Sequence, residues 1–475
     1  MPHLPDRRDP VVVGYRPLVV VLLSPLVFAL VFASWTIFAV LGLELREPLG
    51  LDELDFAFML ATPMLTGALA ALPMAALARR HGGRRVMIAC LLLICPFLWA
   101  IARSSSYSHF LLSGAGLGLG AGSLAAGLVY VGELSPRRHV GLALGLYGAG
   151  MMGAGLSYLL LPLVSQAYGW RSAPLLYLLP VLTVATLLWL FADDPDPAAD
   201  SGLSADSGLS ADSGLSADSG LSADSGLSAD SGLSGFGLSD SDPAAGSDLG
   251  AAVGGTRPGP RLSGWLRALR HWHPWRLAVV YSFFYGAFVA LSLWLPAYLE
   301  AQYGLGIRYA ALLALPFPLA VGLGQVAGGV WGDVHDFRAL RWWVSAWVLV
   351  CLFLLSYPPF DMRVEGVEGV LMLRYSAPLW GFLTLLVAMG LVMGVGQGSL
   401  MRMIHRDHGQ QLALVGGLAL TLGGLFGALL PVMFALGNHW VGIRTAGFMF
   451  LYASLVLCML VMVWDHASQA GQTRP

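Results

Sequence analysis

Twelve long apolar runs, each free of Asp, Glu, Lys and Arg, constrain the fold of this chain more than any other sequence feature. Each run is long enough, or nearly so, to cross the roughly 30 Å hydrocarbon core of a bilayer. Because backbone N–H and C=O groups in lipid need partners within their own segment, we predict that the runs are helices. The expected fold class is therefore an all-α integral membrane protein with twelve transmembrane helices. The runs are Pro17–Leu43, Phe56–Ala78, Val86–Ala102, Phe110–Gly132, Val140–Val164, Ala173–Ala192, Leu277–Leu299, Ala310–Gly332, Trp342–Phe360, Tyr375–Met401, Gln411–Gly437 and Ala446–Trp464.

The composition excludes two broad classes of protein. Charged residues make up 11% of the 475 residues, against about 25% in a typical soluble protein, so an ordinary soluble enzyme is excluded. The net charge of −2 provides no basic surface for nucleic acid. All 26 basic residues are Arg, which removes lysine-based catalysis. His405 and His408 have a spacing that could bind metal, but in an Arg-rich segment we expect them to be solvated. We predict no enzyme activity, no cofactor and no metal site.

The arginines are distributed unequally between the two sides of the predicted helices. With the N-terminus inside the cell, 19 of them lie on the cytoplasmic side and 7 on the outside. Cytoplasmic loops of membrane proteins carry an excess of positive residues. We therefore predict a multi-pass protein of the cell's inner (plasma) membrane, with both termini in the cytoplasm.

A polar segment divides the chain into two parts with six apolar runs each. We predict an N-terminal six-helix bundle over residues 1–192, a cytoplasmic low-complexity linker over 193–274 and a C-terminal six-helix bundle over 275–475. The linker contains five consecutive copies of Ser-Gly-Leu-Ser-Ala-Asp, a composition that cannot bury enough apolar surface to fold. We interpret it as a spacer between the bundles, with an acidic interaction segment as the alternative.

The two bundles share internal sequence similarity. Gly118-Leu-Gly-Ala-Gly-Ser-Leu124 in the fourth run matches Gly394-Val-Gly-Gln-Gly-Ser-Leu400 in the tenth. The second run and the loop after it match the eighth in the same way. Two pseudo-symmetric sets of six helices around a central cytoplasmic loop are typical of secondary transporters. The glycine-rich faces predict surfaces on which helices pack or slide closely.

Four stretches, in the same order along the chain, carry a resemblance to a known family. They resemble the second, seventh, tenth and eleventh spans of the nitrate/nitrite porter family within the major facilitator superfamily. The resemblance implies the major facilitator fold and one central site that opens alternately to the two sides of the membrane. The stretches are Ala61–Leu69 with His81–Arg85, Gly286–Leu299, Gly394–Ile404 and Gly423–Pro431.

The resemblance also implies where a solute binds. Family members hold an anion between arginines on the second and eighth spans, but here these positions fall on Ala71 and Gln325. The fifth-span asparagine falls on Met151 or Met152, and the seventh-span tyrosine is retained as Tyr281. An amide such as that of Gln325 suits a neutral or weakly bound solute, or serves only as an interhelical hydrogen bond. The candidate substrate-binding residues, for each of which helix packing is the alternative, are Gln325, Tyr281, Tyr147, Tyr285 and Gln397.

A cytoplasmic gate is the second site that the resemblance implies. In the family, an Asp in the loop between the second and third spans holds this gate through contacts with Arg and with helix ends. Arg79 occupies the Asp position here, while the second half keeps an Asp at the equivalent place. We expect a one-sided gate, with topology-setting charge as the alternative reading, made of Asp333, Gly329, Arg338, Arg84 and Arg85.

The sequence favours one function and leaves others open. The first is a secondary-active transporter that moves a small polar solute by alternating access, nitrate or nitrite by resemblance. The alternatives are a transporter of a different, neutral solute and a transport-incompetent membrane sensor or partner-binding protein, which the missing arginine pair favours. The expected partners are the small solute, a coupling ion and the lipid bilayer, and no nucleic acid.

Deletion of the repeat tests the interpretation of the linker. Without Ser201–Asp230, membrane expression and solute uptake should equal those of the full chain, because an unfolded spacer contributes no packing. Uptake into membrane vesicles, normalised to the amount of protein, is the measurement. Loss of uptake at normal expression would show that the acidic repeat takes part in an interaction.

Overall fold

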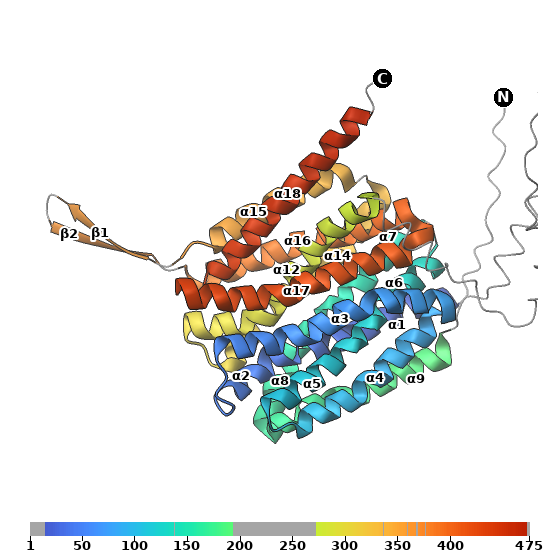
Figure 1. Cartoon of the computed structure of the whole chain (residues 1–475), viewed down its shortest axis with the longest axis horizontal. Coiled ribbons are helices and arrows are strands. Elements are labelled where there is room, and N and C mark those ends of the chain that lie inside the picture. Colours follow the sequence, from blue (N-terminus) through green and yellow to red (C-terminus); the bar gives the residue numbers. More distant parts are fainter. Residues whose placement is uncertain are drawn as a thin grey trace, which may run out of the picture. The chain divides into compact units, whose positions relative to one another are not determined.

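The computed structural model describes residues 15–192 and 272–472, apart from 137, 336, 359, 367, 368 and 376. The predicted linker lies almost entirely outside these described residues. Within them the chain is helical except for one β-hairpin and short loops (Figure 1). The helices on both sides of the linker belong to one compact unit.

Residues 15–192, here called the N-terminal half, contain nine α-helices. Four short 3-10 segments, η1 to η4, connect or extend them. The α-helices are α1 (Tyr15–Trp35), α2 (Ile37–Arg46), α3 (Glu53–His81), α4 (Gly83–Arg103), α5 (Tyr107–Gly118), α6 (Gly122–Leu134), α7 (Val140–Gly148), α8 (Gly153–Tyr168) and α9 (Leu178–Phe191). The 3-10 segments are η1 (Leu119–Ala121), η2 (Ala149–Met152), η3 (Trp170–Ser172) and η4 (Pro174–Tyr177).

Residues 272–472, here called the C-terminal half, contain seven further helices and the hairpin. The helices are α12 (Trp272–Tyr303), α13 (Ile307–Ala314), α14 (Pro316–Val334), α15 (Phe337–Leu355), α16 (Leu379–His408), α17 (Leu412–Val441) and α18 (Ala446–Gln472), with the 3-10 segment η5 (Gly409–Gln411) between α16 and α17.

The predicted spans are found as apolar helices. In the part of the chain that the structure describes, eleven helical segments are long and apolar enough to cross a membrane. They coincide with every predicted run except the ninth, where the shorter apolar helix Leu340–Leu355 lies. The whole of α15 has 19 residues and rises by about 28 Å, close to the thickness of a hydrocarbon core. The all-α membrane fold is thus confirmed.

A β-hairpin, which we did not predict, lies between α15 and α16. Its strands β1 (Phe360–Gly366) and β2 (Gly369–Tyr375) pair antiparallel, with Phe360 opposite Tyr375. The β1 sequence Phe-Asp-Met-Arg-Val-Glu alternates apolar and polar residues, which is the period of a strand. We call the end of the bundle that carries it the hairpin end. The opposite end, where α9 stops and α12 begins, is the linker end (Figure 1).

Two spans of the N-terminal half tighten into a 3-10 turn at glycine-rich points. The turn η1 separates α5 from α6, and η2 separates α7 from α8. Glycine has no Cβ and adopts the tighter turn at little steric cost, and such mid-helix turns often mark hinges. The η2 turn lies beside α1 and α14, so one of these points lies where the two halves meet.

Glycine brings the halves into backbone contact along α7 and α14. A Cβ added to Gly329 would lie 2.1 Å from the carbonyl oxygen of Gly141. One added to Gly145 would lie 2.6 Å from the carbonyl oxygen of Gln325. Neither distance admits a real side chain, so these two helices touch through their backbones. We call this contact the α7–α14 seam.

A second seam joins α3 of the N-terminal half to α17 of the C-terminal half. A Cβ on Gly424 would lie 2.8 Å from the Cβ of Ala68, and one on Gly417 would lie 3.1 Å from the Cβ of Ala75. Small-residue faces of this kind let membrane helices approach closely and gain van der Waals contact. The two seams hold the halves together along their length.

Filling the α7–α14 seam should destabilise the protein. Gly329→Ala places a methyl group against the backbone of Gly141, and such overpacking costs about 1–3 kcal/mol. We expect a lower midpoint of thermal unfolding, measured by size-exclusion chromatography of heated detergent samples. Gly155→Ala is the matched control, because its methyl group would lie 3.8 Å from the nearest atom, an ordinary contact. Equal midpoints for the two variants would contradict the seam.

Candidate functional site

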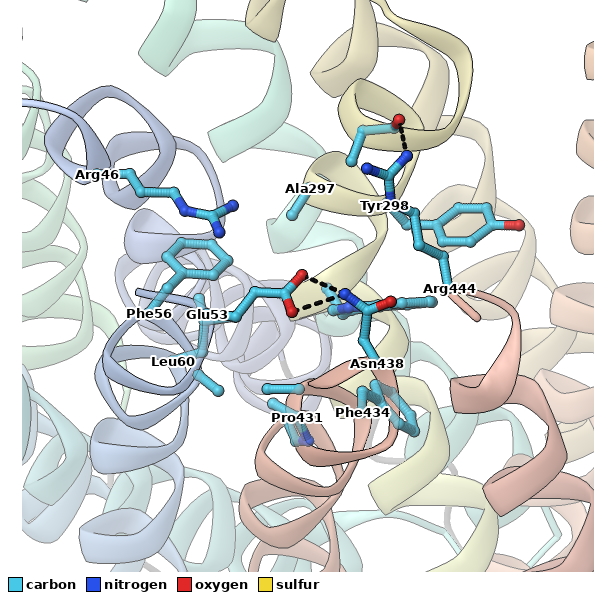
Figure 2. A pocket seen from close by; sticks show the side chains of 14 residues that line it. Arg46, Glu53, Phe56, Leu60, Ala297, Tyr298, Pro431, Phe434, Asn438 and Arg444 are labelled. Carbon is cyan, nitrogen blue, oxygen red and sulfur yellow. Dashed lines mark hydrogen bonds between the residues drawn. The ribbon is translucent and has the colours of Figure 1, made fainter. Parts of the chain in front are cut away.

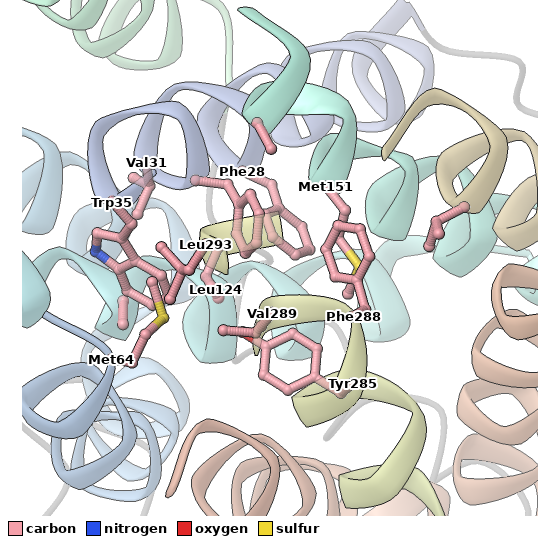
Figure 3. Close-up of a cluster of buried hydrophobic side chains, with 14 of the residues drawn as sticks. Phe28, Val31, Trp35, Met64, Leu124, Met151, Tyr285, Phe288, Val289 and Leu293 are labelled. Atoms are coloured by element: carbon pink, nitrogen blue, oxygen red, sulfur yellow. The ribbon is translucent and has the colours of Figure 1, made fainter. Parts of the chain in front are cut away.

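Apolar side chains fill the centre of the bundle where the halves meet (Figure 3). Phe32 of α1 stacks on Phe288 of α12, with ring centroids 5.5 Å apart. Beside them lies a cavity of about 10 Å³, which has room for about one water molecule. No charged side chain lines this central cavity. Its lining residues are Trp35, Met64, Gly67, Ala68, Ala71, Ala121, Leu124, Tyr285, Leu420 and Gly424.

Ala71 and Tyr285 are thus brought together at the central cavity. Tyr285 stacks on Tyr281 with ring centroids 5.9 Å apart, and both side chains are buried. Among the described residues, neither hydroxyl has a hydrogen-bond partner. The Tyr147 hydroxyl, in contrast, donates to the carbonyl of Leu124 at 2.7 Å. Two of the three candidate tyrosines therefore keep a free donor, and the third is bound to the backbone.

The two candidate glutamines bind each other away from the central cavity. Nε2 of Gln325 donates to Oε1 of Gln397 at 2.8 Å, and Nε2 of Gln397 donates to the carbonyl of Phe284 at 2.9 Å. Nε2 of Gln325 also lies 2.8 Å from the sulfur of Met151, across the junction of the halves. Gln325, the expected position of the family's eighth-span arginine, is therefore in contact with Met151, one of the two expected positions of the fifth-span asparagine.

At the linker end, Asp333 joins the halves. Its carboxylate accepts hydrogen bonds from the backbone N–H groups of Gly141 at 2.9 Å and Leu142 at 3.0 Å. These groups lie in the first turn of α7, where free N–H groups and the helix dipole favour an anion. Nε of Arg402 donates to the same carboxylate at 2.7 Å. The α7–α14 seam therefore ends, at the linker end, in a charge-assisted cap that Asp333 places on α7.

The other predicted gate residues are placed less centrally. Gly329 lies in the α7–α14 seam. Arg84 donates to the carbonyl of Ala192 within the N-terminal half, and Arg85 is exposed. The side chain of Arg338 lies outside the described residues.

Two contacts at the linker end differ from the sequence expectation. Arg402, not named as a gate residue, pairs with Asp333, because α16 packs closely along α14. His405 is half-buried rather than solvated, and its Nε2 lies 3.1 Å from the carbonyl oxygen of Gly132 in the N-terminal half. The sequence offered a weak signal, since both residues lie on α16 just after the tenth apolar run.

The hairpin end carries its own bond between the halves, which the sequence analysis missed. Nδ2 of Asn438 on α17 lies 2.7 and 2.6 Å from the two carboxylate oxygens of Glu53, at the start of α3 (Figure 2). Deeper between the halves, the Tyr158 hydroxyl donates to the carbonyl of Ser292. Polar contacts therefore join the halves at both ends, with the apolar centre between them.

Comparison with known proteins identifies the family to which this architecture belongs. The family profile of the Major Facilitator Superfamily matches residues 23–431. A probable nitrate/nitrite antiporter, NarK1, of Thermus thermophilus is 27% identical over 459 residues, covering 94% of this chain and 90% of the relative. A nitrite extrusion protein of Bacillus subtilis is 22% identical, covering 93% of each chain. These relatives are transporters and not enzymes, and they confirm the predicted resemblance to nitrate/nitrite porters.

Solved structures agree on the fold. The human organic anion transporter MFSD10 superposes with a TM-score of 0.58 at 16% identity, covering 94% of this chain and 99% of the other. A bacterial homologue of the human lysosomal transporter Spinster gives the same TM-score at 14% identity, covering 96% and 97%. The family profile covers most of the sequence and the helical architecture matches it, so the chain is a multi-pass membrane protein that belongs to the Major Facilitator Superfamily.

Proposed function

We propose that this protein is a secondary-active transporter that moves nitrate or nitrite by alternating access. The observation that carries the proposal is the pairing of separate polar contacts at the two ends of the junction. Asp333 bonds α7 at the linker end, and Glu53 bonds Asn438 at the hairpin end. Rigid halves that rock about a central site need one such contact to break while the other holds. The relatives named as nitrate and nitrite transporters supply the solute.

The linker end faces the cytoplasm in this proposal. The segments at this end carry most of the arginines, 19 of 26, by the assignment made from the sequence. Positive residues are retained on the cytoplasmic side of membranes. Both termini are then cytoplasmic, and the β-hairpin lies outside the cell. The contact of Asp333 with α7 and Arg402 is the cytoplasmic gate in this orientation.

Among the described residues, no positively charged side chain lines the central cavity, so an anion there must bind to neutral donors. The free hydroxyls of Tyr281 and Tyr285 are the available donors, because the Gln325 amide lies away from the central cavity and already donates to Gln397. Hydrogen bonds to a charged group are each worth about 1.5–3 kcal/mol. Such donors offset part of the cost of dehydrating a monovalent anion, so binding is weak and release is easy. No carboxylate is found among the described residues that line the central cavity, so in this proposal the coupling ion binds elsewhere.

Flux into proteoliposomes tests the proposal. We expect the native chain to carry nitrate or nitrite with weak apparent affinity. The double variant Ala71→Arg/Gln325→Arg should lower the apparent KM by about tenfold or more, because each arginine adds a charge-assisted bond. The matched control is Ala167→Arg/Gln411→Arg, which makes the same substitutions at two exposed positions away from the central cavity. Control and double variant with the same KM would contradict a solute site between these positions.

A second function is favoured by the uncharged lining of the central cavity. A family member that no longer transports would keep the fold and the seams and act as a membrane sensor or partner-binding protein. Silence of the native chain for both ions, with flux in the double variant, would support this reading or a neutral solute. Flux in the native chain would exclude the sensor.

The cytoplasmic gate gives a further prediction. Asp333→Asn removes the ion pair with Arg402 and weakens the cap on α7, a loss of about 1–3 kcal/mol from the closed state. We expect faster hydrogen exchange of the amides at the start of α7, measured by mass spectrometry. Asp407→Asn is the control, because among the described residues Asp407 pairs only with its exposed neighbour Arg406. Unchanged exchange in Asp333→Asn would rule out the gate.

A further inference from the structure

A pocket at the hairpin end places two arginines from different halves around one space (Figure 2). Arg46 ends α2 of the N-terminal half, and Arg444 lies in the loop between α17 and α18. The pocket has a volume of about 40 Å³. This volume holds about three water molecules. A small planar oxyanion needs a similar space.

The guanidinium of Arg46 is free to bind a ligand. It lies over the ring of Phe56, 6.0 Å from the ring centroid. In the described part of the chain it makes no hydrogen bond or ion pair. A guanidinium has five N–H donors in a planar fork that matches the geometry of an oxyanion. Arg46 lines the pocket and is only half-buried, so these donors face its open space and are available to an anion that enters it.

Arg444 adds a second, more accessible donor group. Its Nη1 donates to the carbonyl of Ala301, which fixes the side chain at the rim of the pocket. The other N–H groups remain available, because no further partner of Arg444 is found among the described residues. Arg444 is exposed and Arg46 is half-buried, so an ion entering from the hairpin end meets Arg444 first.

Two carboxylates limit how tightly an anion is held. Glu53 lines the same pocket and is bound by Asn438, and Glu300 lies close enough to Arg46 to feel its charge. The two guanidinium charges are therefore partly offset. An ion held here is attracted but not trapped, so it can move on from an entry site.

We propose that Arg46 and Arg444 form an entry site for a small monovalent oxyanion of the nitrate or nitrite type, ahead of the uncharged central cavity. The proposal rests on the proposed function, because it assigns the solute's first contact. The site places positive charge where water is still available and dehydration is incomplete. Glu53 both lines this pocket and accepts from Asn438 in the contact that joins α3 to α17, so an arriving anion acts directly on that contact by repulsion of like charge.

Nitrate-dependent thermal stability of the purified full-length protein tests the site. Sodium nitrate is titrated against sodium gluconate at constant ionic strength, since screening alone changes weak ion binding. The apparent Kd follows from the rise of the unfolding midpoint with nitrate concentration. Arg46→Gln and Arg444→Gln should each raise this Kd about tenfold, the loss expected for one charge-assisted contact. Glu53→Gln should lower it, because the like charge is removed while the amide oxygen still accepts from Asn438.

Arg103→Gln is the matched control. Arg103 also lies at the hairpin end and also stacks on an aromatic ring, 5.4 Å from the centroid of Trp99, but it does not line the pocket. Its Kd should equal that of the native chain. The opposite shifts in the Arg46 and Glu53 variants cannot come from misfolding, which would weaken both.

Two outcomes overturn the entry site: no stabilisation of the native chain by nitrate, or the same Kd in all four variants. Proteoliposome flux separates this failure from failure of the proposed function. Native nitrate flux with a Kd independent of Arg46 and Arg444 leaves the transporter in place and removes the entry site. A Kd that depends on both arginines, without native flux of nitrate or nitrite, supports the anion site and removes the transport proposal.

Discussion

Close backbone contact between the two halves is the feature on which the rest of this structure depends. In a bilayer, apolar side chains gain little by leaving lipid, so helices associate through close packing and interhelical hydrogen bonds. The α7–α14 seam supplies the closest contacts, with Gly329 against Gly141 and Gly145 against Gln325. The seam also fixes the position of Asp333, one turn beyond Gly329, at the first turn of α7. The close packing of α7 against α14 therefore determines where the Asp333 carboxylate lies.

Charged and polar groups are sorted to the ends of the junction. Asp333 and Arg402 lie at the linker end, and Glu53, Arg46 and Arg444 lie at the hairpin end. Ionised groups cost free energy in hydrocarbon and are most stable where water reaches them. The centre keeps neutral hydrogen-bonding groups, such as the amides of Gln325 and Gln397, whose donors find partners inside the protein. The same sorting that makes the fold stable in a membrane leaves each end with its own polar contact between the halves.

The helical spans were predictable from sequence because their signal is local: length, apolarity and the absence of charge. The partners across the halves were not, because they depend on which helix packs against which. Arg402 pairs with Asp333 across 69 positions of sequence, since Gly394 and Gly398 bring α16 against α14. The bond between Glu53 and Asn438 joins residues 385 positions apart. The hairpin could have been predicted, because the alternation of apolar and polar residues in β1 is a local sequence pattern.

An uncharged centre also sets which ions such a protein can carry. The cost of moving an ion out of water rises steeply with its charge, and neutral donors such as the tyrosine hydroxyls return the same few hydrogen bonds to any anion. A divalent oxyanion therefore loses far more at the central cavity than a monovalent one, even where both fit the space. Arginines at the centre would reduce this difference, because they attract the divalent ion more strongly. Under the proposed function, the uncharged lining that includes Ala71 favours monovalent anions or neutral solutes, and charge recognition falls to the hairpin end, where Arg46 and Arg444 lie.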